Sequence, residues 1–228
     1  GVRADRATPG QFRRSQNWIG PPGCTLANAS YVPPPVDELM NCLGQWEDFL
    51  QNRKMPPLIQ VALLHYQFEA IHPFLDGNGR VGRLLITLFL IERGILPTPL
   101  LYLSAFFETT RRDYYDRLAG VSHHAAWSEY LEYFLNGVVR MSADALSRAE
   151  RINSLLVKWR KSAAGTVSKT PLALIDLLAE NPFWTINKAA ERLEVAYTTA
   201  QRAVKTLESL GVIEQVSDVK RGRVYCAK

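Results

Sequence analysis

Cysteine, long apolar runs and a large excess of one charge are all scarce in this 228-residue chain. Its 3 cysteines are odd in number and widely spaced, which argues against a disulfide framework or a cysteine metal cluster and fits a reducing compartment. The longest mainly apolar run, residues 84–91, is too short to span a bilayer, and no signal peptide is recognisable. A formal net charge of +5 permits contact with a polyanion without demanding it. We therefore expect a globular cytoplasmic protein of bacterial type.

A polar stretch at residues 72–83, His-Pro-Phe-Leu-Asp-Gly-Asn-Gly-Arg-Val-Gly-Arg, separates two apolar helical runs at 58–71 and 81–91. This pattern predicts a short loop that joins the end of one helix to the start of the next. The first N–H groups of a helix have no partner within it and point at whatever lies above them, which makes an anion site. Gly77 and Gly79 allow the backbone to approach a ligand closely.

The charged residues of the same stretch suit the transfer of a phosphate-containing group. Arg80 and Arg83 are three residues apart, so they share a helix face and can clamp phosphate oxygens. Asp76 can hold a hard divalent cation, and His72 can take a proton near neutral pH. The alternative is a helix–turn–helix corner with surface arginines. That alternative gives no packing reason for the glycines, the arginines and Asp-Gly-Asn to coincide.

The stretch resembles the Fic family motif, His-Pro-Phe-x-Asp/Glu-Gly-Asn-Gly-Arg-x-x-Arg, at every specified position. Fic proteins mostly transfer AMP from ATP to a hydroxyl of a target protein. The resemblance implies that His72 deprotonates the attacking hydroxyl and that Asp76 holds Mg²⁺ between the α- and β-phosphates. It implies that Phe74 is a buried anchor of the ATP-binding loop. The residues that bind the phosphates are then Gly77, Asn78, Gly79, Arg80 and Arg83, with Arg83 on the γ-phosphate.

Segments before the motif resemble the same family. Residues 11–20 resemble the stretch that precedes the Fic core, and residues 19–32 have short apolar ends around turn residues, as in a β-hairpin. In Fic proteins this position is the flap, which aligns the target by adding a strand to it. The alternative is a proline-rich surface loop. The predicted flap residues are Ile19, Gly20, Ser30, Tyr31 and Val32.

Helical periodicity predicts further helices at 36–51, 101–118, 127–134 and 138–161. The sequence Arg-Arg-Asp-Tyr-Tyr within 101–118 resembles a family stretch near the adenine, so that Tyr114 or Tyr115 would border the base. A tyrosine pair at this spacing equally suits core packing. His65 is not part of the motif, and a core or surface role suits it better than catalysis.

The C-terminal residues follow a linker of small and polar residues at 162–170. Helices are expected at 171–180, 185–193 and 197–210, and strands at 212–216 and 223–226. This order resembles a winged helix–turn–helix domain, with Lys220, Arg221 and Arg223 in its wing. Such a domain either binds DNA or serves as a protein docking or dimerisation module. The residues that suit DNA contact on its third helix are Thr198, Thr199, Gln201, Arg202 and Lys205.

The predicted fold is mostly α: a Fic-type helical core with a small β-hairpin flap at 1–161, a linker at 162–170 and a winged helix–turn–helix domain at 171–228. The predicted function is transfer of AMP from ATP, with Mg²⁺, to a Tyr, Ser or Thr hydroxyl of a target protein. The alternatives are a nucleotide-sensing DNA-binding regulator and a Fic transferase with another nucleotide donor. The family's inhibitory motif, Ser/Thr-x-x-x-Glu-Gly/Asn, is not found in the sequence. The chain as given is therefore expected to be constitutively competent. The alternative is inhibition by a helix upstream of Gly1 or on a partner. A homodimer is a further expectation.

Overall fold

The structure is a computed structural model that describes residues 10–166, 168–219 and 222–228. The predictions that fall on residues 1–9 and on Lys220 and Arg221 of the wing lie outside the described residues. Contacts divide the chain into two compact units, Gly1–Ala145 and Leu146–Lys228. The predicted linker at 162–170 stays a prediction, since this division falls earlier, within a helix.

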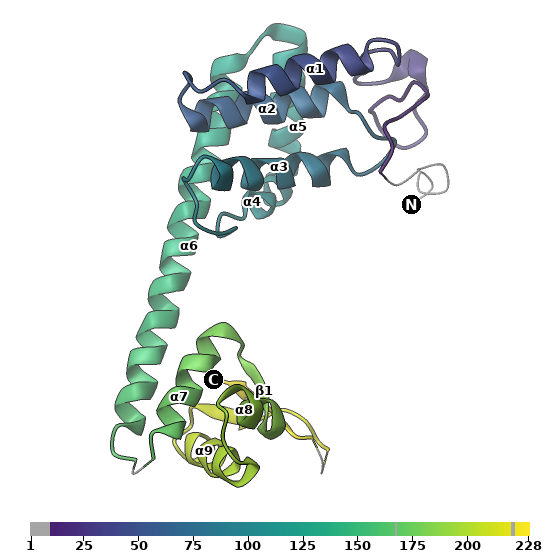
Figure 1. The fold of residues 1–228 in the computed structure, drawn as a ribbon. Coiled ribbons are helices and arrows are strands. Elements are labelled where there is room, and N and C mark those ends of the chain that lie inside the picture. Colours follow the sequence, from purple (N-terminus) through teal and green to yellow (C-terminus); the bar gives the residue numbers. More distant parts are fainter. Residues whose placement is uncertain (1–9, 167, 220–221) are drawn as a thin grey trace. The chain divides into compact units, whose positions relative to one another are not determined.

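The first unit consists of helices around one hydrophobic core (Figure 1). Its helices are η2 (Leu26–Asn28), α1 (Leu39–Leu50), α2 (Pro57–Ile71), α3 (Asn78–Glu92), α4 (Leu103–Thr109), α5 (Arg111–His124) and the first part of α6 (Trp127–Ala163). Helices α1, α2 and α3 lie side by side. The centre is α2, whose buried side chains include Val61, Leu64 and Phe68. The helices predicted on either side of the polar loop are confirmed.

The predicted helix at 101–118 is two helices, because the chain leaves the helical region at Thr110 with φ −113° and ψ 34°. The Thr110 hydroxyl donates to a carbonyl oxygen of the preceding turn and also hydrogen-bonds a tyrosine hydroxyl of α6. It lies 2.7 Å from the carbonyl oxygen of Phe106 and 2.7 Å from the hydroxyl of Tyr133. This break separates α4 from α5.

The predicted helices at 127–134 and 138–161 are one helix, α6. Gly137 does not interrupt it. A Cβ atom built on Gly137 would lie 2.5 Å from Cδ1 of Phe106, so the missing side chain makes room for that ring. The glycine therefore serves packing between α6 and α4.

The predicted β-hairpin flap is a single antiparallel bridge between Ile19 and Tyr31 and not a ladder. The Ile19 N–H donates to Tyr31 O at 2.9 Å, and the Tyr31 N–H donates to Ile19 O at 3.1 Å. Pro21 and Pro22 follow and have no N–H to donate, which ends the pairing.

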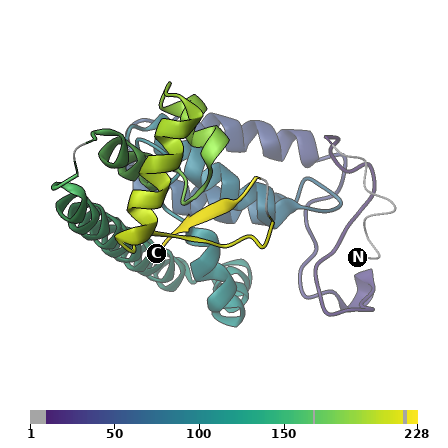
Figure 2. The ribbon, with the colours of Figure 1, turned by 90° about the horizontal axis from the view of Figure 1, so that it is seen from below.

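The second unit is a small helical domain with a three-stranded sheet (Figures 1 and 2). After the end of α6 it contains α7 (Thr170–Glu180), β1 (Phe183–Thr185), α8 (Ile186–Arg192), α9 (Tyr197–Ser209), β2 (Ile213–Gln215) and β3 (Val224–Ala227). The strand order is β1-β3-β2, and both pairs are antiparallel. Thr185 caps α8, because its hydroxyl accepts the Lys188 N–H. This arrangement confirms the predicted winged helix–turn–helix fold, with β1 as a strand that the sequence pattern did not reveal.

Within the described ranges, no helix has the combined length and apolar content needed to cross a membrane. Cys24, Cys42 and Cys226 are free thiols.

Candidate active site

The polar loop lies between two unusual backbone conformations. Helix α2 ends at His72, whose φ of 49° and ψ of 59° are left-handed. Helix α3 begins after Gly77, which has φ 89°. A glycine adopts this conformation without cost, whereas at a histidine it must be maintained by surrounding contacts.

Two side chains of the N-terminal segment supply those contacts. Arg13 is almost fully buried and donates through Nε to the carbonyl oxygen of His72 at 3.1 Å, and through Nη2 to that of Pro34. Asn17 donates through Nδ2 to the carbonyl oxygens of His72 and Phe74, at 3.3 and 3.1 Å. The loop backbone is therefore fixed from outside the motif.

The same geometry fixes the tautomer of His72. Its Nδ1 lies 3.2 Å from the backbone carbonyl oxygen of Glu69. A carbonyl only accepts, so Nδ1 carries the proton of the neutral ring and Nε2 is the basic nitrogen. His72 borders a polar cavity of about 280 Å³ above the loop, where Nε2 can take a proton from a reacting group.

Asn78 clamps the loop. Its Oδ1 accepts the Phe74 N–H at 2.8 Å and its Nδ2 donates to Phe74 O at 2.7 Å. The Phe74 ring packs on Phe12 and Phe68, with centroids 5.4 and 6.4 Å away, which agrees with an anchoring role. The Asn78 amide is thus engaged by the backbone, and a contact of Asn78 with phosphate is left to its N–H group at the start of α3.

Asp76 and the two arginines of the motif lie around the polar cavity. Oδ1 of Asp76 accepts the Gly77 N–H at 2.7 Å. Oδ2 of Asp76 lies 3.6 Å from Nη2 of the exposed Arg80. The Arg83 guanidinium lies over Gly79, because a Cβ atom built there would be 3.0 Å from Nη1. Together with the N-terminus of α3, these groups form a concave surface suited to a polyphosphate.

A larger cavity of about 560 Å³ adjoins the first and is bordered by the flap. Ile19, Gly20, Ser30 and Tyr31 line it, whereas Val32 is not among its lining residues. Both cavities share His72, Gly79, Arg83, Arg111, Tyr114 and Tyr115. His72 therefore lies where the flap side and the loop side meet.

The structure separates the two predicted adenine-region tyrosines. Tyr114 is buried, hydrogen-bonds Nε2 of His65 at 2.9 Å and stacks on Phe107 at 4.8 Å between centroids, so it is mainly a core residue. Tyr115 is half-exposed, and the Arg111 guanidinium lies 5.8 Å from its ring centroid. Tyr115 is thus the better placed of the two to border a base.

His65 is a core residue, as expected. Burial, with a smaller contribution from the charge of Arg83, lowers the pKa of His65 to about 4, so the ring is neutral at physiological pH. Glu69 behaves in the opposite sense: burial raises the pKa of its carboxyl to about 7, and Arg83 opposes this rise.

Four residues near the site were missed from the sequence: Arg13, Asn17, Glu69 and Arg111. Two signals were available in the sequence. Arg13 and Asn17 lie in the stretch 11–20, and Glu69 is a carboxylate within the apolar run 58–71. None of these signals indicates which atoms the side chains contact.

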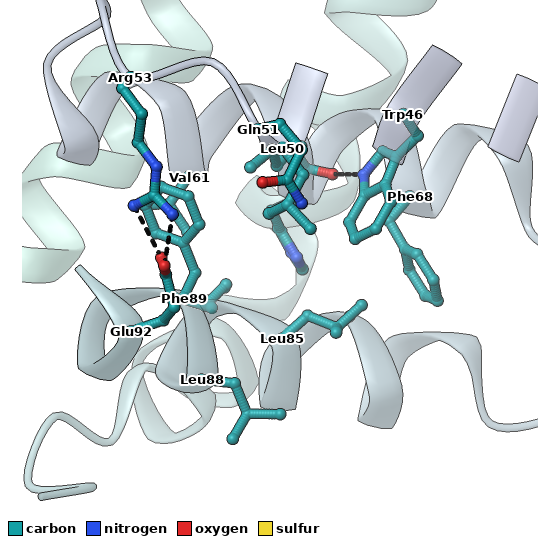
Figure 3. Close-up of a pocket in the computed structure, with 14 residues that line it drawn as sticks. Trp46, Leu50, Gln51, Arg53, Val61, Phe68, Leu85, Leu88, Phe89 and Glu92 are labelled. Carbon is teal, nitrogen blue, oxygen red and sulfur yellow. Dashed lines mark hydrogen bonds and ion pairs between the residues drawn. The ribbon is translucent and has the colours of Figure 1, made fainter. Parts of the chain in front are cut away.

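A separate apolar cavity of about 270 Å³ lies between α1, α2 and α3 (Figure 3). Trp46, Leu50 and Phe68 face it, and the ion pair between Arg53 and Glu92 lies at one end. From the stretch 72–83 it is lined by Gly82, which has no reactive side chain, so we do not assign chemistry to it.

In the second unit, part of the predicted DNA-contact set lines a hollow of about 490 Å³. Gln201 and Lys205 follow Tyr197 at one-turn intervals along α9, and Arg223 borders the hollow beside β3. Thr198 and Arg202 are exposed elsewhere on α9, whereas Thr199 is partly buried.

Comparison with known proteins agrees with both units. Residues 3–90 match the Fic/DOC family, and residues 171–217 match the IclR helix-turn-helix domain. A crystal structure of a Fic family protein from Desulfovibrio desulfuricans has the same fold, with a TM-score of 0.57 at 24% identity, covering 96% of this chain and 62% of that one.

Curated relatives match over the first unit. The protein adenylyltransferase Fic of Drosophila willistoni is 36% identical over 91 residues, which are 39% of this chain and 16% of the relative. A probable protein adenylyltransferase of Aquifex aeolicus is 39% identical over 72 residues, 31% of this chain and 22% of the relative. The chain thus spans less than a quarter of the length of these relatives.

Proposed function

Because the chain carries a Fic family domain at residues 3–90 and an IclR-type helix-turn-helix domain at residues 171–217, we propose that it transfers AMP from ATP to a hydroxyl of a target protein. The relatives that are named protein adenylyltransferases support this type of reaction. The structural observation that carries the proposal is the position of His72 and Arg83, which border both the polar cavity above the loop and the cavity beside the flap.

In the proposed reaction, the nucleotide occupies the polar cavity and the target hydroxyl enters beside Ile19 and Tyr31. The hydroxyl oxygen attacks the α-phosphorus, and the bond from this phosphorus to the oxygen bridging to the β-phosphate breaks. The hydroxyl proton goes to Nε2 of His72, and pyrophosphate leaves. Arg80, Arg83 and the N-terminus of α3 hold the outer phosphates and offset their charge.

Asp76 is the residue that would hold Mg²⁺. Magnesium in nucleotide sites is usually bound by one or two carboxylates together with substrate phosphates. Asp76 fits this requirement, since it is exposed at the polar cavity and is only loosely paired with Arg80. The part of the chain that the structure describes has no cluster of three or more His, Cys, Asp or Glu that could hold a metal ion. Phosphate oxygens would thus complete the coordination, and the bound ion would neutralise charge on the α- and β-phosphates.

The test is incubation of the chain with α-labelled ATP, Mg²⁺ and a lysate, followed by detection of labelled protein and of the added mass of AMP. His72→Ala should lower label transfer by at least about 100-fold, on the order of the usual contribution of a general base. The matched control is His124→Ala, an exposed histidine at the end of α5. Labelling by His72→Ala at the parent rate would show that the base is another group.

Arg83 is proposed to bind the γ-phosphate, so its loss should weaken ATP more than ADP. Arg83→Ala removes a charge-assisted contact, for which we expect a loss of roughly 1.5–3 kcal/mol in ATP binding. Calorimetry with both nucleotides measures the difference. Arg53→Ala, which removes a surface arginine paired with Glu92, should leave both affinities unchanged. Equal losses for ATP and ADP in Arg83→Ala would remove Arg83 from the γ-phosphate.

The nucleotide base is tested separately, because the ring of Tyr115 would stack on any base. Parallel reactions with α-labelled ATP, UTP, GTP and CTP measure the preference directly. We expect ATP to give the strongest labelling. Stronger labelling with another nucleotide would leave the transferase assignment in place and change its donor.

For the second unit, contact with DNA is the second candidate function. The observation that favours it is the alignment of Tyr197, Gln201 and Lys205 along α9 beside Arg223. Fluorescence anisotropy with a labelled duplex at several salt concentrations tests it. A double variant, Arg202→Ala with Lys205→Ala, should weaken binding and reduce the salt slope by about 0.9 for each phosphate that is no longer neutralised. No binding at low salt would favour a protein-docking role.

A further inference from the structure

Glu69 is a carboxylate that the proposed mechanism does not use, although it lies beside the motif. It belongs to the last turn of α2, three residues before His72, and faces α3. A Cβ atom built on Gly82 would lie only 2.6 Å from its Oε1, so the carboxyl rests directly against the backbone of α3. This Oε1 is buried, and no hydrogen-bond partner for it exists among the residues that the structure describes.

The guanidinium of Arg83 borders the same space. A Cβ atom built on Gly79 would lie 3.0 Å from Nη1 of Arg83 and 3.9 Å from Oε1 of Glu69. Both side chains also line the cavity of about 560 Å³ that contains His72. A change of side-chain torsions would therefore bring the guanidinium onto the carboxylate, and a buried carboxylate oxygen without a donor, such as Oε1, favours such a partner.

Three other titratable groups near Glu69 carry no charge at neutral pH, whereas Arg111, His72 and His123 line the same cavity as Glu69 and Arg83. Tyr114 of α5 and Tyr130 of α6 face the carboxyl, and burial raises the pKa of both well above its usual value. His65, on the same helix, has its pKa lowered to about 4 by burial. These three groups are neutral between roughly pH 6 and pH 9, given the direction of these shifts. Arg83 is the cation that the charge of Glu69 meets from α3.

We propose that Glu69 is a positioning residue that competes with the outer phosphate of a nucleoside triphosphate for Arg83. When ionised, Glu69 draws the guanidinium inward and withholds it from the phosphate. When it takes a proton from the solvent, the guanidinium is released to the nucleotide. Binding of the triphosphate is therefore coupled to protonation of Glu69. This proposal rests on the proposed function, in which Arg83 binds ATP.

The test is isothermal calorimetry of ATP with Mg²⁺ in two buffers of different ionisation enthalpy. The protein is the full chain with His72→Ala, so that no AMP is transferred. We expect uptake of a fraction of a proton, at most about one per ATP, and an affinity that falls several-fold between about pH 7 and pH 8.5. Adding Glu69→Gln should remove this uptake and make ATP binding tighter and nearly independent of pH. ADP, which lacks the γ-phosphate, should show little coupling.

Two further variants separate positioning from folding. Glu92→Gln makes the same chemical change at a surface carboxylate of α3, and it should keep the parent proton uptake. Glu69→Asp keeps a carboxyl and should retain the coupling between ATP binding and proton uptake. If thermal unfolding shows that Glu69→Gln does not fold, Glu69→Asp provides the test of this coupling instead. A parent that fails to bind ATP contradicts the nucleotide site itself. If the parent binds ATP but takes up as many protons as Glu69→Gln, the proposed role of Glu69 alone is wrong. The same conclusion follows if the affinity of the parent for ATP does not depend on pH.

Discussion

At the scale of single residues, the left-handed backbone at His72 depends on side chains that are distant in sequence. The Arg13 guanidinium reaches the His72 carbonyl across 59 residues, and the Asn17 amide reaches it across 55. The last carbonyl groups of a helix have no partner within it, and a cation is favourable at this end of the helix dipole. Arg13 therefore satisfies the end of α2 and orients the proposed base at the same time.

Replacing Arg13 should affect both stability and the chemical step. In Arg13→Ala the carbonyl groups of His72 and Pro34 lose a charged donor, for which we expect a decrease of roughly 1.5–3 kcal/mol in the free energy of unfolding. A shift of His72 should lower kcat roughly 10- to 100-fold, with little change in the affinity for ATP. Urea unfolding and label transfer measure the two effects. The adjacent, exposed Arg14 gives a matched control, since Arg14→Ala should change neither; equal effects of both variants would contradict the positioning role.

His65 should make the stability of the protein depend on pH. Its pKa is about 4 in the folded state and near 6.5 when unfolded, so the unfolded chain binds more protons between these values. The contribution of His65 is thus fully present above about pH 6.5 and is lost as the pH falls towards 4, by up to about 3 kcal/mol. Urea unfolding of the parent and of His65→Gln at about pH 4.5 and pH 7 checks this. The parent should gain more free energy of unfolding than His65→Gln as the pH is raised. A difference between the two proteins that stays the same at both pH values would contradict the role of His65.

At the scale of elements, the pairing of α2 with α3 depends on small residues at their contact. Gly79 and Gly82 lie in the first two turns of α3, where the side chains of Glu69 and Phe68 approach the backbone. This close approach allows a short, compact loop to join the end of α2 to the start of α3. The glycines of the motif thus serve packing as well as access for a ligand.

Adding one methyl group at this contact should be costly. A Cβ atom on Gly82 would lie 2.6 Å from Oε1 of Glu69 and 3.2 Å from Cδ1 of Phe68, so Gly82→Ala should lower the free energy of unfolding by roughly 1–3 kcal/mol. Gly44 in α1 has no atom within 4 Å of such a position. Gly44→Ala should therefore raise stability by roughly 0.5–1 kcal/mol, because alanine is the better helix former. Thermal unfolding compares the pair, and a shift of the same sign in both would contradict this account.

The elements that could be predicted are those determined by local pattern. Apolar periodicity located α2 and α3 to within about three residues at each end, since each is a long run bounded by proline or glycine. The motif likewise indicated which residues would gather at the polar cavity. In contrast, β1 is only three residues long and pairs with β3 more than 35 residues later, as Phe183 with Cys226 shows. Pairing at that separation leaves no local signal.

The parts of the site that were missed also depend on long-range contacts. The break at Thr110 involves the hydroxyl of Tyr133, which lies on α6. Arg13 and Asn17 are tied to the loop by atoms more than 50 residues away. The motif residues are predictable because they act together within one short stretch, whereas the side chains that hold that stretch in place come from elsewhere in the fold.

At the scale of the whole molecule, the described residues form two separate hydrophobic cores, and α6 contributes to both. Phe134 and Val138 belong to the first core, while Leu156 and Trp159 belong to the second. No residue of α6 between 139 and 155, all within the described part, is buried. Each core therefore depends on its own part of this helix, and destabilising one need not disturb the other.

We expect the two units to unfold in separate transitions. Trp159→Ala removes a large side chain from the second core and should destabilise that unit by roughly 3–5 kcal/mol, while ATP binding and AMP transfer in the first unit persist. Phe134→Ala should do the reverse, because its ring packs on Tyr130 and Phe107 in the first core. Hydrogen exchange read by mass spectrometry reports the stability of each unit separately, without relying on tryptophan fluorescence. If either variant increases exchange equally in both units, the two cores unfold as one cooperative structure and α6 transmits the loss from one to the other.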